Sequence, residues 1–215
     1  MRTIKEGTMR GWMRLVGIGM MLGAWAGSAV GAPKDIIGKP APDFTLLDQR
    51  SEQHRLSEFR GKFVVLEWTN PECPFVRKHY DSRNMQGLQT KYTDQGVVWL
   101  SVDSAGPGNQ GYVTGEQAAE LIRQRRAAPT AFLLDPQGTV GRLYGAKATP
   151  HLFIVDPAGV LIYAGGIDDL PSTNPEDVKG AVNYVDQALT EARAGKPVSV
   201  PATQPYGCSV KYGGG

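Results

Sequence analysis

The stretch KFVVLEWTNPECPFVRKHY, residues 62–80, decides the fold, because a run of strand-forming residues passes directly into the start of a helix. The run from Phe63 to Trp68 is rich in β-branched and aromatic residues, which is typical of a buried central strand. Pro74 suits the first turn of a helix, where its missing N–H leaves no hydrogen bond unmade. The sequence therefore places Cys73 between the end of a buried strand and the N-terminus of a helix.

The position of Cys73 favours a reactive thiol. A helix N-terminus presents unpaired N–H groups and about half a positive charge, which lowers the pKa of a cysteine from about 8.5 into a range of about 3.5–7.5. Arg77, one turn further on, adds to this effect, whereas the neighbouring Glu72 opposes it. The alternative is a small buried residue that only packs, since free cysteine packs well in cores.

Further strands are predicted on both sides of this stretch. Phe44 and Leu46 alternate with polar neighbours, and after a turn residues 54–56 form the second half of an entry hairpin. Residues 97–104 read as the next strand. The segments TAFLLDPQGTV and HLFIVDPAGVLIY, residues 130–140 and 151–163, each form a strand that ends in an Asp-Pro-x-Gly turn.

Helical patterns separate these strands. The helix from Pro74 is expected to break near residues 81–84 and to restart through 85–96. Thr114 and Gln117 form a capping box at the start of another helix. Residues 174–195 predict one further helix, with Asn174 as its cap and Gly195 at its end. Strands that alternate with helices indicate an α/β sandwich with a largely buried sheet.

The first 31 residues have the layout of a secretory signal peptide: basic residues, then an apolar run from Leu15, then small residues. We expect cleavage within residues 27–32. A retained membrane anchor is the alternative, although the run is short and rich in glycine. The 23 basic and 21 acidic residues of the chain include four and one in this leader, so 19 basic and 20 acidic residues remain. A net charge near −1 gives no indication of nucleic-acid binding, and no later segment is apolar enough to cross a bilayer.

Export implies an oxidising compartment, in which paired cysteines persist. The chain has two cysteines, Cys73 and Cys208, which allow one intramolecular pair. Cys208 lies in an extended, proline-rich C-terminal tail, residues 196–215, which we expect to fold back onto the domain.

Two long motifs carry a resemblance to a known family. KFVVLEWTNPECPF resembles the active-site strand and helix start of thioredoxin-like proteins, and GAKATPHLFIVDPAGVLIYAGG resembles the second characteristic sequence motif of these proteins. The layout GKPAPDFTLLDQ…HRLSEFRGKFVVLEW is similar to the redoxins related to alkyl hydroperoxide reductase and thiol-specific antioxidant. CPFV and the ending PYGCSVKY resemble a peroxiredoxin-like bacterial family. The resemblance covers about residues 37–212 and implies a thioredoxin-like three-layer α/β sandwich with a central mixed sheet, with its domain at residues 35–195.

The departures from the family pattern limit the chemistry that the resemblance implies. Val76 stands where thioredoxins carry their second cysteine, so a dithiol exchange within one Cys-x-x-Cys site is excluded. Thr69 is four residues before Cys73, whereas peroxiredoxins carry Thr-x-x-Cys. Pro150 stands where peroxiredoxins place an activating arginine. We therefore expect slow peroxidase chemistry, while thiol–disulfide exchange stays open.

The resemblance also implies roles for individual residues. The Thr149–Pro150 bond is expected to be cis and to lie beside Cys73, with Pro150 shaping the groove. Cys208 is expected to be the partner of Cys73, either as a resolving cysteine or in a static disulfide. Closing this loop of about 135 residues would stabilise the fold by roughly 4–5 kcal/mol in the chain-entropy model.

Several other side chains are candidates for the site. His151 follows the cis proline and is expected either to approach Cys73 as a base or ligand or to be a satisfied histidine at the site edge. For Glu67, a buried acid in a strand, we expect an ion pair with a nearby lysine or arginine rather than a proton relay. Trp68 either lines the site or packs in the core. His79 is expected on the surface, and Asp168 in a loop.

The sequence thus predicts an exported, periplasmic or secreted, thiol–disulfide oxidoreductase or weak thiol peroxidase, without cofactor or metal. Its partners would be a protein or small-molecule disulfide or hydroperoxide and an external thiol reductant. Cys73 would be the nucleophile and Cys208 the resolving cysteine. The first rival is a non-enzymatic binding or structural module with a static Cys73–Cys208 disulfide, and the second is a copper-binding protein, which would need two cysteines on the loop.

Overall fold

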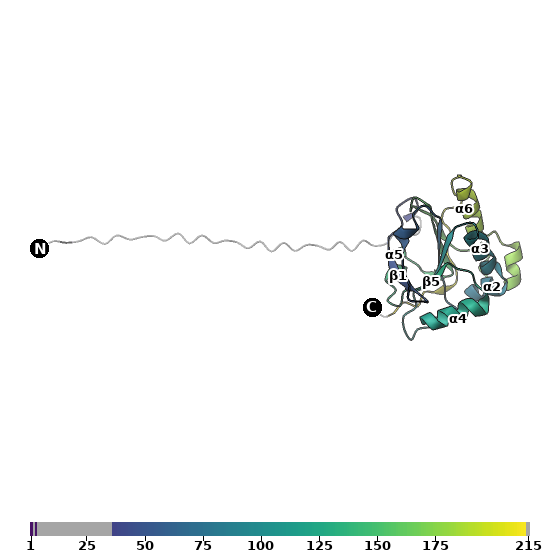
Figure 1. Cartoon of the computed structure of the whole chain (residues 1–215), viewed down its shortest axis with the longest axis horizontal. Coiled ribbons are helices and arrows are strands. Elements are labelled where there is room, and N and C mark those ends of the chain that lie inside the picture. The colour runs from purple at the N-terminus through teal and green to yellow at the C-terminus, as the bar shows by residue number, and fades with distance from the viewer. Residues whose placement is uncertain (2, 4–35, 214–215) are drawn as a thin grey trace.

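The computed structural model describes residues 1, 3 and 36–213. Apart from Met1 and Thr3, the predicted signal peptide lies outside the described residues. Within the described part of the chain, no helix is both long and apolar enough to span a membrane. Figure 1 shows helices on both sides of a central sheet, which confirms the predicted three-layer α/β sandwich.

Seven strands form the central sheet, in the order β2-β1-β5-β4-β3-β7-β8. Their bounds are β1 Thr45–Asp48, β2 Gln53–Arg55, β3 Val64–Trp68, β4 Val98–Asp103, β5 Ala131–Leu134, β7 His151–Val155 and β8 Leu161–Gly165. β3 and β5 run parallel to β4, whereas β7 lies antiparallel to β3, so the predicted mixed sheet is confirmed. A separate two-stranded sheet pairs β6, Ala148–Thr149, with β9, Cys208–Ser209.

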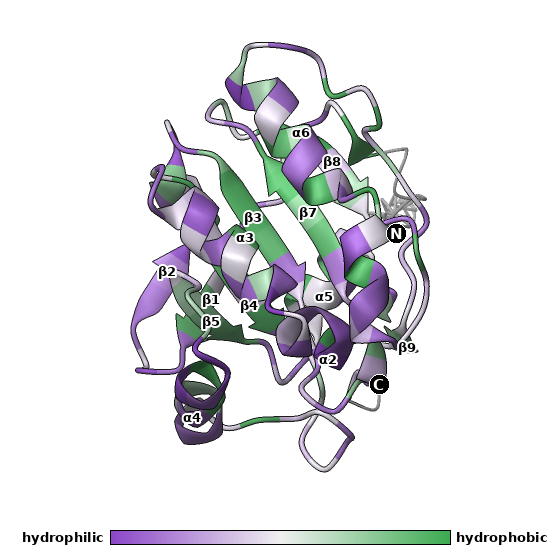
Figure 2. Cartoon of the chain, turned by 90° about the vertical axis from the view of Figure 1, so that its right-hand side faces the viewer, coloured by the Kyte–Doolittle hydropathy of each residue, from purple (hydrophilic) through white to green (hydrophobic). Residues whose placement is uncertain are grey.

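The helices cover the two faces of the sheet unequally. Their bounds are α2 Pro74–Asp81, α3 Asn84–Thr93, α4 Gly115–Arg125, α5 Thr139–Tyr144 and α6 Tyr184–Arg193, with short 3-10 helices η1 Leu56–Phe59 and η2 Pro175–Gly180. α2, α3 and α6 lie on one face, and α5 lies on the other (Figures 1 and 2). The alternating side chains of β3 reach both cores: Val65 packs with α2 and α3, and Leu66 packs with α5.

Most of the predicted element boundaries are confirmed. The helix that begins at Pro74 ends at Asp81, and the next begins at Asn84, with Arg83 between them in the left-handed region at φ 64°. Thr114 and Gln117 form the predicted capping box of α4.

The prediction of one helix over residues 174–195 is wrong. Asn174 caps only the 3-10 helix η2, and the chain is extended again at Ala181 before α6 begins at Tyr184. The physical reason is a second cap, because the Asn183 side chain accepts a hydrogen bond from the Asp186 N–H at 2.9 Å and starts a new helix.

Candidate functional site

Cys73 lies at the carboxyl end of β3, where the sequence placed it. It is the N-cap residue of α2, with extended backbone at φ −71° and ψ 123°, and Pro74 follows in the first turn. The loop before it is held by Asn70, whose side-chain oxygen accepts the Glu72 N–H at 2.8 Å and whose carbonyl accepts the Cys73 N–H at 3.1 Å. The Cys73 side chain is buried, with 0% of its surface exposed.

The Thr149–Pro150 peptide bond lies beside this thiol. The bond is cis, as the sequence predicted. The Cys73 thiol donates a hydrogen bond to the Thr149 carbonyl oxygen at 3.1 Å. Cys73 and Thr149, which are 76 residues apart in the sequence and belong to the two family-like motifs, therefore meet at one site.

The C-terminal tail folds back to the same place, as predicted. β9 pairs antiparallel with β6, and Cys208 lies in register with Thr149. Gly207 makes this approach possible: its φ is 124°, and a Cβ atom there would lie 2.0 Å from the Thr149 carbonyl oxygen. Both cysteines are free thiols, and Cys208 packs against the cluster that contains Cys73.

The two thiols have opposite pKa shifts. Burial alone raises the pKa of Cys73, but hydrogen bonds from the side chain and backbone of Cys208 and from the Val76 N–H outweigh it, so that the pKa is lowered overall. Burial, followed by the hydrogen bond to Cys73 and the charge on it, raises the pKa of Cys208 to about 11. Cys73 is therefore the more acidic thiol of the two, and Cys208 lies where its thiol can donate a hydrogen bond to the Cys73 sulfur when Cys73 ionises.

Glu67 is fully buried, and the expected ion pair is wrong. Within the described residues no lysine or arginine pairs with its carboxyl group, which instead accepts four hydrogen bonds from neutral donors. These are the Tyr80 hydroxyl at 2.8 Å, Gln89 Nε2 at 3.1 Å, Trp99 Nε1 at 2.8 Å and the Ser101 hydroxyl at 3.0 Å. Burial raises the pKa of Glu67 despite these bonds. Four donors of fixed geometry take the place of a counter-ion, and a proton-relay role remains a prediction.

His151 and Trp68 do not line the thiol site. Both lie opposite each other in the β3–β7 register and pack with Phe153 on the sheet face away from α2. The His151 Nδ1 atom accepts the Lys147 N–H at 3.4 Å, and burial lowers the pKa of His151 to about 3. The Trp68 indole N–H donates to the Ser104 hydroxyl at 3.0 Å. The expectation that His151 approaches Cys73 fails because successive side chains of a strand point to opposite faces.

A buried polar cluster beside the tail was missed by the sequence analysis. Lys78 and His79 of α2 have fully buried side chains, and Lys78 forms an ion pair with Asp168 at 3.2 Å. The Tyr206 hydroxyl, two residues before Cys208, donates to the same carboxylate. The expectation of a surface His79 is wrong, because the tail covers that side of α2, the hydrophilic helix next to β9 in Figure 2.

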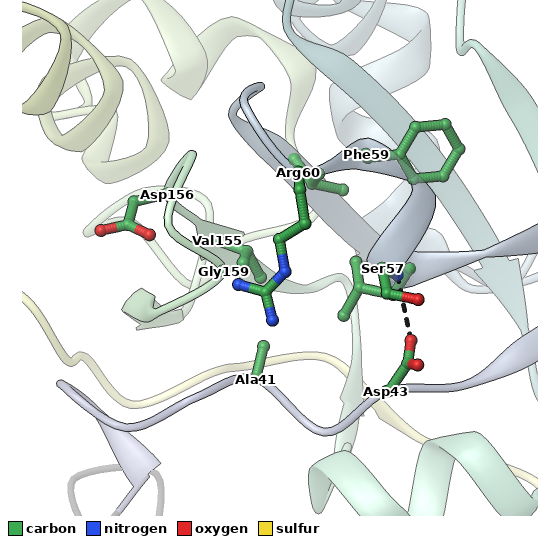
Figure 3. A pocket seen from close by; sticks show the side chains of 10 residues that line it. Ala41, Asp43, Ser57, Phe59, Arg60, Val155, Asp156 and Gly159 are labelled. Atoms are coloured by element: carbon green, nitrogen blue, oxygen red, sulfur yellow. Dashed lines mark hydrogen bonds between the residues drawn. The ribbon is translucent and has the colours of Figure 1, made fainter.

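Other features lie away from the thiols. Figure 3 shows a small pocket lined by Asp43, Arg60 and Val155. Val155 pairs with Val64 at the start of β3, so this pocket is at the opposite end of the sheet from Cys73. Among the described residues, the group of acidic and histidine side chains close enough to share a metal ion is Asp48, Glu52 and His54, on the β1–β2 hairpin.

The fold and the juxtaposition of Cys73 with a cis proline define a thioredoxin-fold protein. The family model described as "AhpC/TSA family" matches residues 37–164. Since this match spans more than half of the chain, the protein belongs to the AhpC/TSA family, a redoxin family.

Curated relatives carry a thiol–disulfide name. The chain is 29% identical over 124 residues to "Thiol-disulfide oxidoreductase ResA" of Geobacillus kaustophilus, a match that covers 53% of this chain and 71% of the relative.

Solved structures share the fold over a larger part of the chain. A hypothetical protein of Sinorhizobium meliloti 1021 has a TM-score of 0.73 at 24% identity and covers 83% of this chain and 96% of its own. An uncharacterised conserved protein of Geobacillus kaustophilus has a TM-score of 0.68 at 24% identity, with 83% and 93% covered.

Proposed function

We propose that this protein is an exported thiol–disulfide oxidoreductase in which Cys73 is the nucleophile and Cys208 is the resolving cysteine. The observation that carries the proposal is the pairing of β9 with β6, which brings the Cys208 thiol next to Cys73 at the N-terminus of α2. The family and the thiol–disulfide name of its curated relatives support the same chemistry.

The reaction begins at Cys73. Its thiolate attacks one sulfur of a substrate disulfide, forms a mixed disulfide and releases the other sulfur as a thiolate, which takes up a proton. Cys208 then loses its proton and attacks the Cys73 sulfur, which breaks the mixed disulfide and releases the second substrate thiol. The substrate gains two electrons, and the protein is left with a Cys73–Cys208 disulfide. An external thiol reductant returns both cysteines to thiols.

The state of the two thiols suits these steps in order. The lowered pKa of Cys73 increases the fraction of this thiol that is present as the attacking thiolate, and the raised pKa of Cys208 keeps that thiol protonated until Cys73 has reacted. When Cys73 is in the mixed disulfide, its negative charge is gone, and one cause of the raised pKa of Cys208 is removed. Protein or small-molecule disulfides are the proposed substrates, with hydroperoxides as poorer ones.

Two cysteine substitutions test the proposal on a model disulfide. Cys73→Ser should abolish reductase activity, because the attacking sulfur is lost. Cys208→Ser should accumulate a mixed disulfide at Cys73, visible by mass spectrometry, because attack continues and resolution fails. The wild-type protein purified under oxidising conditions should show Cys73 linked to Cys208, and two free thiols in the wild type after treatment with oxidant would refute the proposal.

A static disulfide gives different results in the same experiment. Both substitutions would then lower stability by a similar few kcal/mol, and neither would trap a mixed disulfide. The reduction potential separates the two cases as well, since structural disulfides lie below about −300 mV and catalytic ones are more easily reduced.

A further inference from the structure

The C-terminal tail is attached to the domain on both sides of Cys208. Upstream, the Thr203 N–H donates to the Ala164 carbonyl at 3.2 Å, and Tyr206 bonds to the buried cluster of α2. Downstream, the Tyr212 hydroxyl donates to the Ala146 carbonyl at 2.7 Å. Tyr206 is the attachment nearest to Cys208 on the upstream side, two residues away, whereas Thr203 is five residues away.

The acceptor side of the Tyr206 attachment is rigid. Its hydroxyl donates to one carboxylate oxygen of Asp168, and Lys78 Nζ donates to the other at 3.2 Å. Lys78 also donates to the Leu170 carbonyl at 2.5 Å. The side chains of Lys78 and Asp168 are 0% and 1% exposed, so the two charges are neutralised within the fold and their positions are fixed.

His79 holds the same hydroxyl through a second hydrogen bond, which the Tyr206 oxygen accepts. The Asn84 amide nitrogen donates to His79 Nδ1 at 2.9 Å, which places the histidine proton on Nε2. His79 Nε2 therefore donates to the Tyr206 oxygen, 3.0 Å away. The Tyr206 ring packs edge-on against Phe75 with the centroids 5.9 Å apart. Tyr206 is thus held by one bond it donates, one it accepts and one ring contact.

We propose that Tyr206 is a positioning residue for the Cys73–Cys208 couple: its anchorage on Asp168 and His79 shortens the tether of Cys208 and so raises the effective concentration of that thiol at Cys73. This inference rests on the proposed function. The balanced reaction is the oxidation of both thiols by oxidised glutathione, which forms the Cys73–Cys208 disulfide and two reduced glutathiones. A higher effective concentration favours the protein disulfide and lowers its reduction potential.

The size of the effect follows from the tether. Without the Tyr206 anchor, the free segment before Cys208 lengthens from two residues to the five that follow Thr203. Effective concentration falls with about the −3/2 power of tether length, so the loss is at most about fourfold, since the β9–β6 pairing still holds Cys208 on its other side. A fourfold change in the exchange equilibrium corresponds to about 20 mV for a two-electron couple.

Tyr212 provides a matched control on the same tail. Tyr206 lies inside the loop that a Cys73–Cys208 disulfide closes, so its anchor restricts the thiol before the bond forms. Tyr212 lies beyond Cys208, outside that loop. On that side the tail is already held nearer to Cys208, by the β9–β6 pairing and by the bond from the Val210 N–H to the Lys147 carbonyl at 3.3 Å, so loss of the Tyr212 bond should leave the tether of Cys208 unchanged.

The experiment compares Tyr206→Phe with Tyr212→Phe in glutathione redox buffers, with the fraction of Cys73–Cys208 disulfide measured by acid quenching and mass spectrometry. Tyr206→Phe should lower the exchange constant by up to about fourfold, and Tyr212→Phe should leave it at the wild-type value. If Tyr206 only stabilised the fold, both variants would have a lower thermal unfolding midpoint, and the reduction potential of the Cys73–Cys208 couple would be the same in the two variants.

Two results overturn the inference, and they are distinguishable. If the wild type forms the disulfide and both variants share its exchange constant, Tyr206 does not position Cys208 and the proposed function stands. If the wild type forms no Cys73–Cys208 disulfide at any glutathione ratio, the proposed function fails and the inference fails with it.

Discussion

Replacing Glu67 with glutamine keeps the size of the side chain and removes its charge. The folded-state pKa of Glu67 is raised above the ordinary value of 4.5, because burial penalises the charged form. Below the unfolded-state pKa both states hold the proton, and the free energy of unfolding is at its full value. As pH rises, the unfolded chain ionises first, so stability falls until pH passes the raised folded-state pKa. Glu67→Gln does not titrate, so its stability relative to the wild type should increase from acidic to alkaline pH.

Alanine at the same position measures the hydrogen bonds. Gln89 Nε2 still donates to the Tyr80 oxygen at 3.2 Å, but the Tyr80 hydroxyl, the Trp99 indole and the Ser101 hydroxyl all lose the carboxylate that accepts their hydrogen bonds. Each unsatisfied buried donor costs about 1–3 kcal/mol, and a cavity adds to this, so Glu67→Ala should lose about 4 kcal/mol. Glutamine retains an oxygen for these donors and an amide that donates to the Tyr80 oxygen.

Urea denaturation followed by tryptophan fluorescence, at acidic, neutral and alkaline pH, measures both effects. A stability difference between wild type and Glu67→Gln that stays constant with pH would refute the assignment of a raised pKa. A loss below about 1 kcal/mol for Glu67→Ala would show that the four donors find other partners in the folded protein.

Three further outcomes are expected. Gly207→Ala should raise the reduction potential of the Cys73–Cys208 couple, because a Cβ would lie 2.0 Å from the Thr149 carbonyl and push the tail away; an unchanged potential in glutathione buffers would contradict this. Mass spectrometry of protein from its native host should find an N-terminus within residues 28–33, whereas an intact N-terminus in the membrane fraction would exclude export by cleavage. Hydrogen peroxide should be consumed slowly by the reduced protein, since Pro150 replaces the activating arginine; turnover faster than that of a model disulfide would contradict this expectation.

The strand and helix at the centre of the fold could be predicted because local sequence determines them. β3 is a continuous run of strand formers, and Pro74 can serve a helix only at its start. The prediction was wrong where two local signals for helix structure compete, in residues 174–195. Val182 fits the apolar spacing of one helix over residues 174–195, yet 50% of its surface is exposed. A new helix begins after Asn183 instead, because the Asn183 side chain accepts the backbone N–H of Asp186, which a continuous helix would have bonded internally.

The predicted surroundings of Glu67 failed for a different reason. Burial of an acid was evident from its place in a strand, and an ion pair is the usual way to neutralise such a charge. The register of β3 against β4 instead places Glu67 opposite Ser101, with Trp99 two residues earlier on the same face. Register depends on how the whole sheet assembles, so the identity of the donors was not contained in the local pattern.

The cluster around Tyr206 shows the same limit at longer range, and it bears on function. Lys78 has no local signal for burial, since lysine is rarely buried unless paired. Its partner Asp168 is 90 residues away, and Tyr206 lies a further 38 residues along the chain. Each residue alone reads as surface or loop, and burial becomes favourable only when the tail has closed over α2. The Tyr206 ring lies over Lys78 and its hydroxyl bonds to Asp168, so the residue of the tail that covers this ion pair also lies two residues before Cys208. Loss of the tail would therefore expose both the charged cluster and the nucleophile.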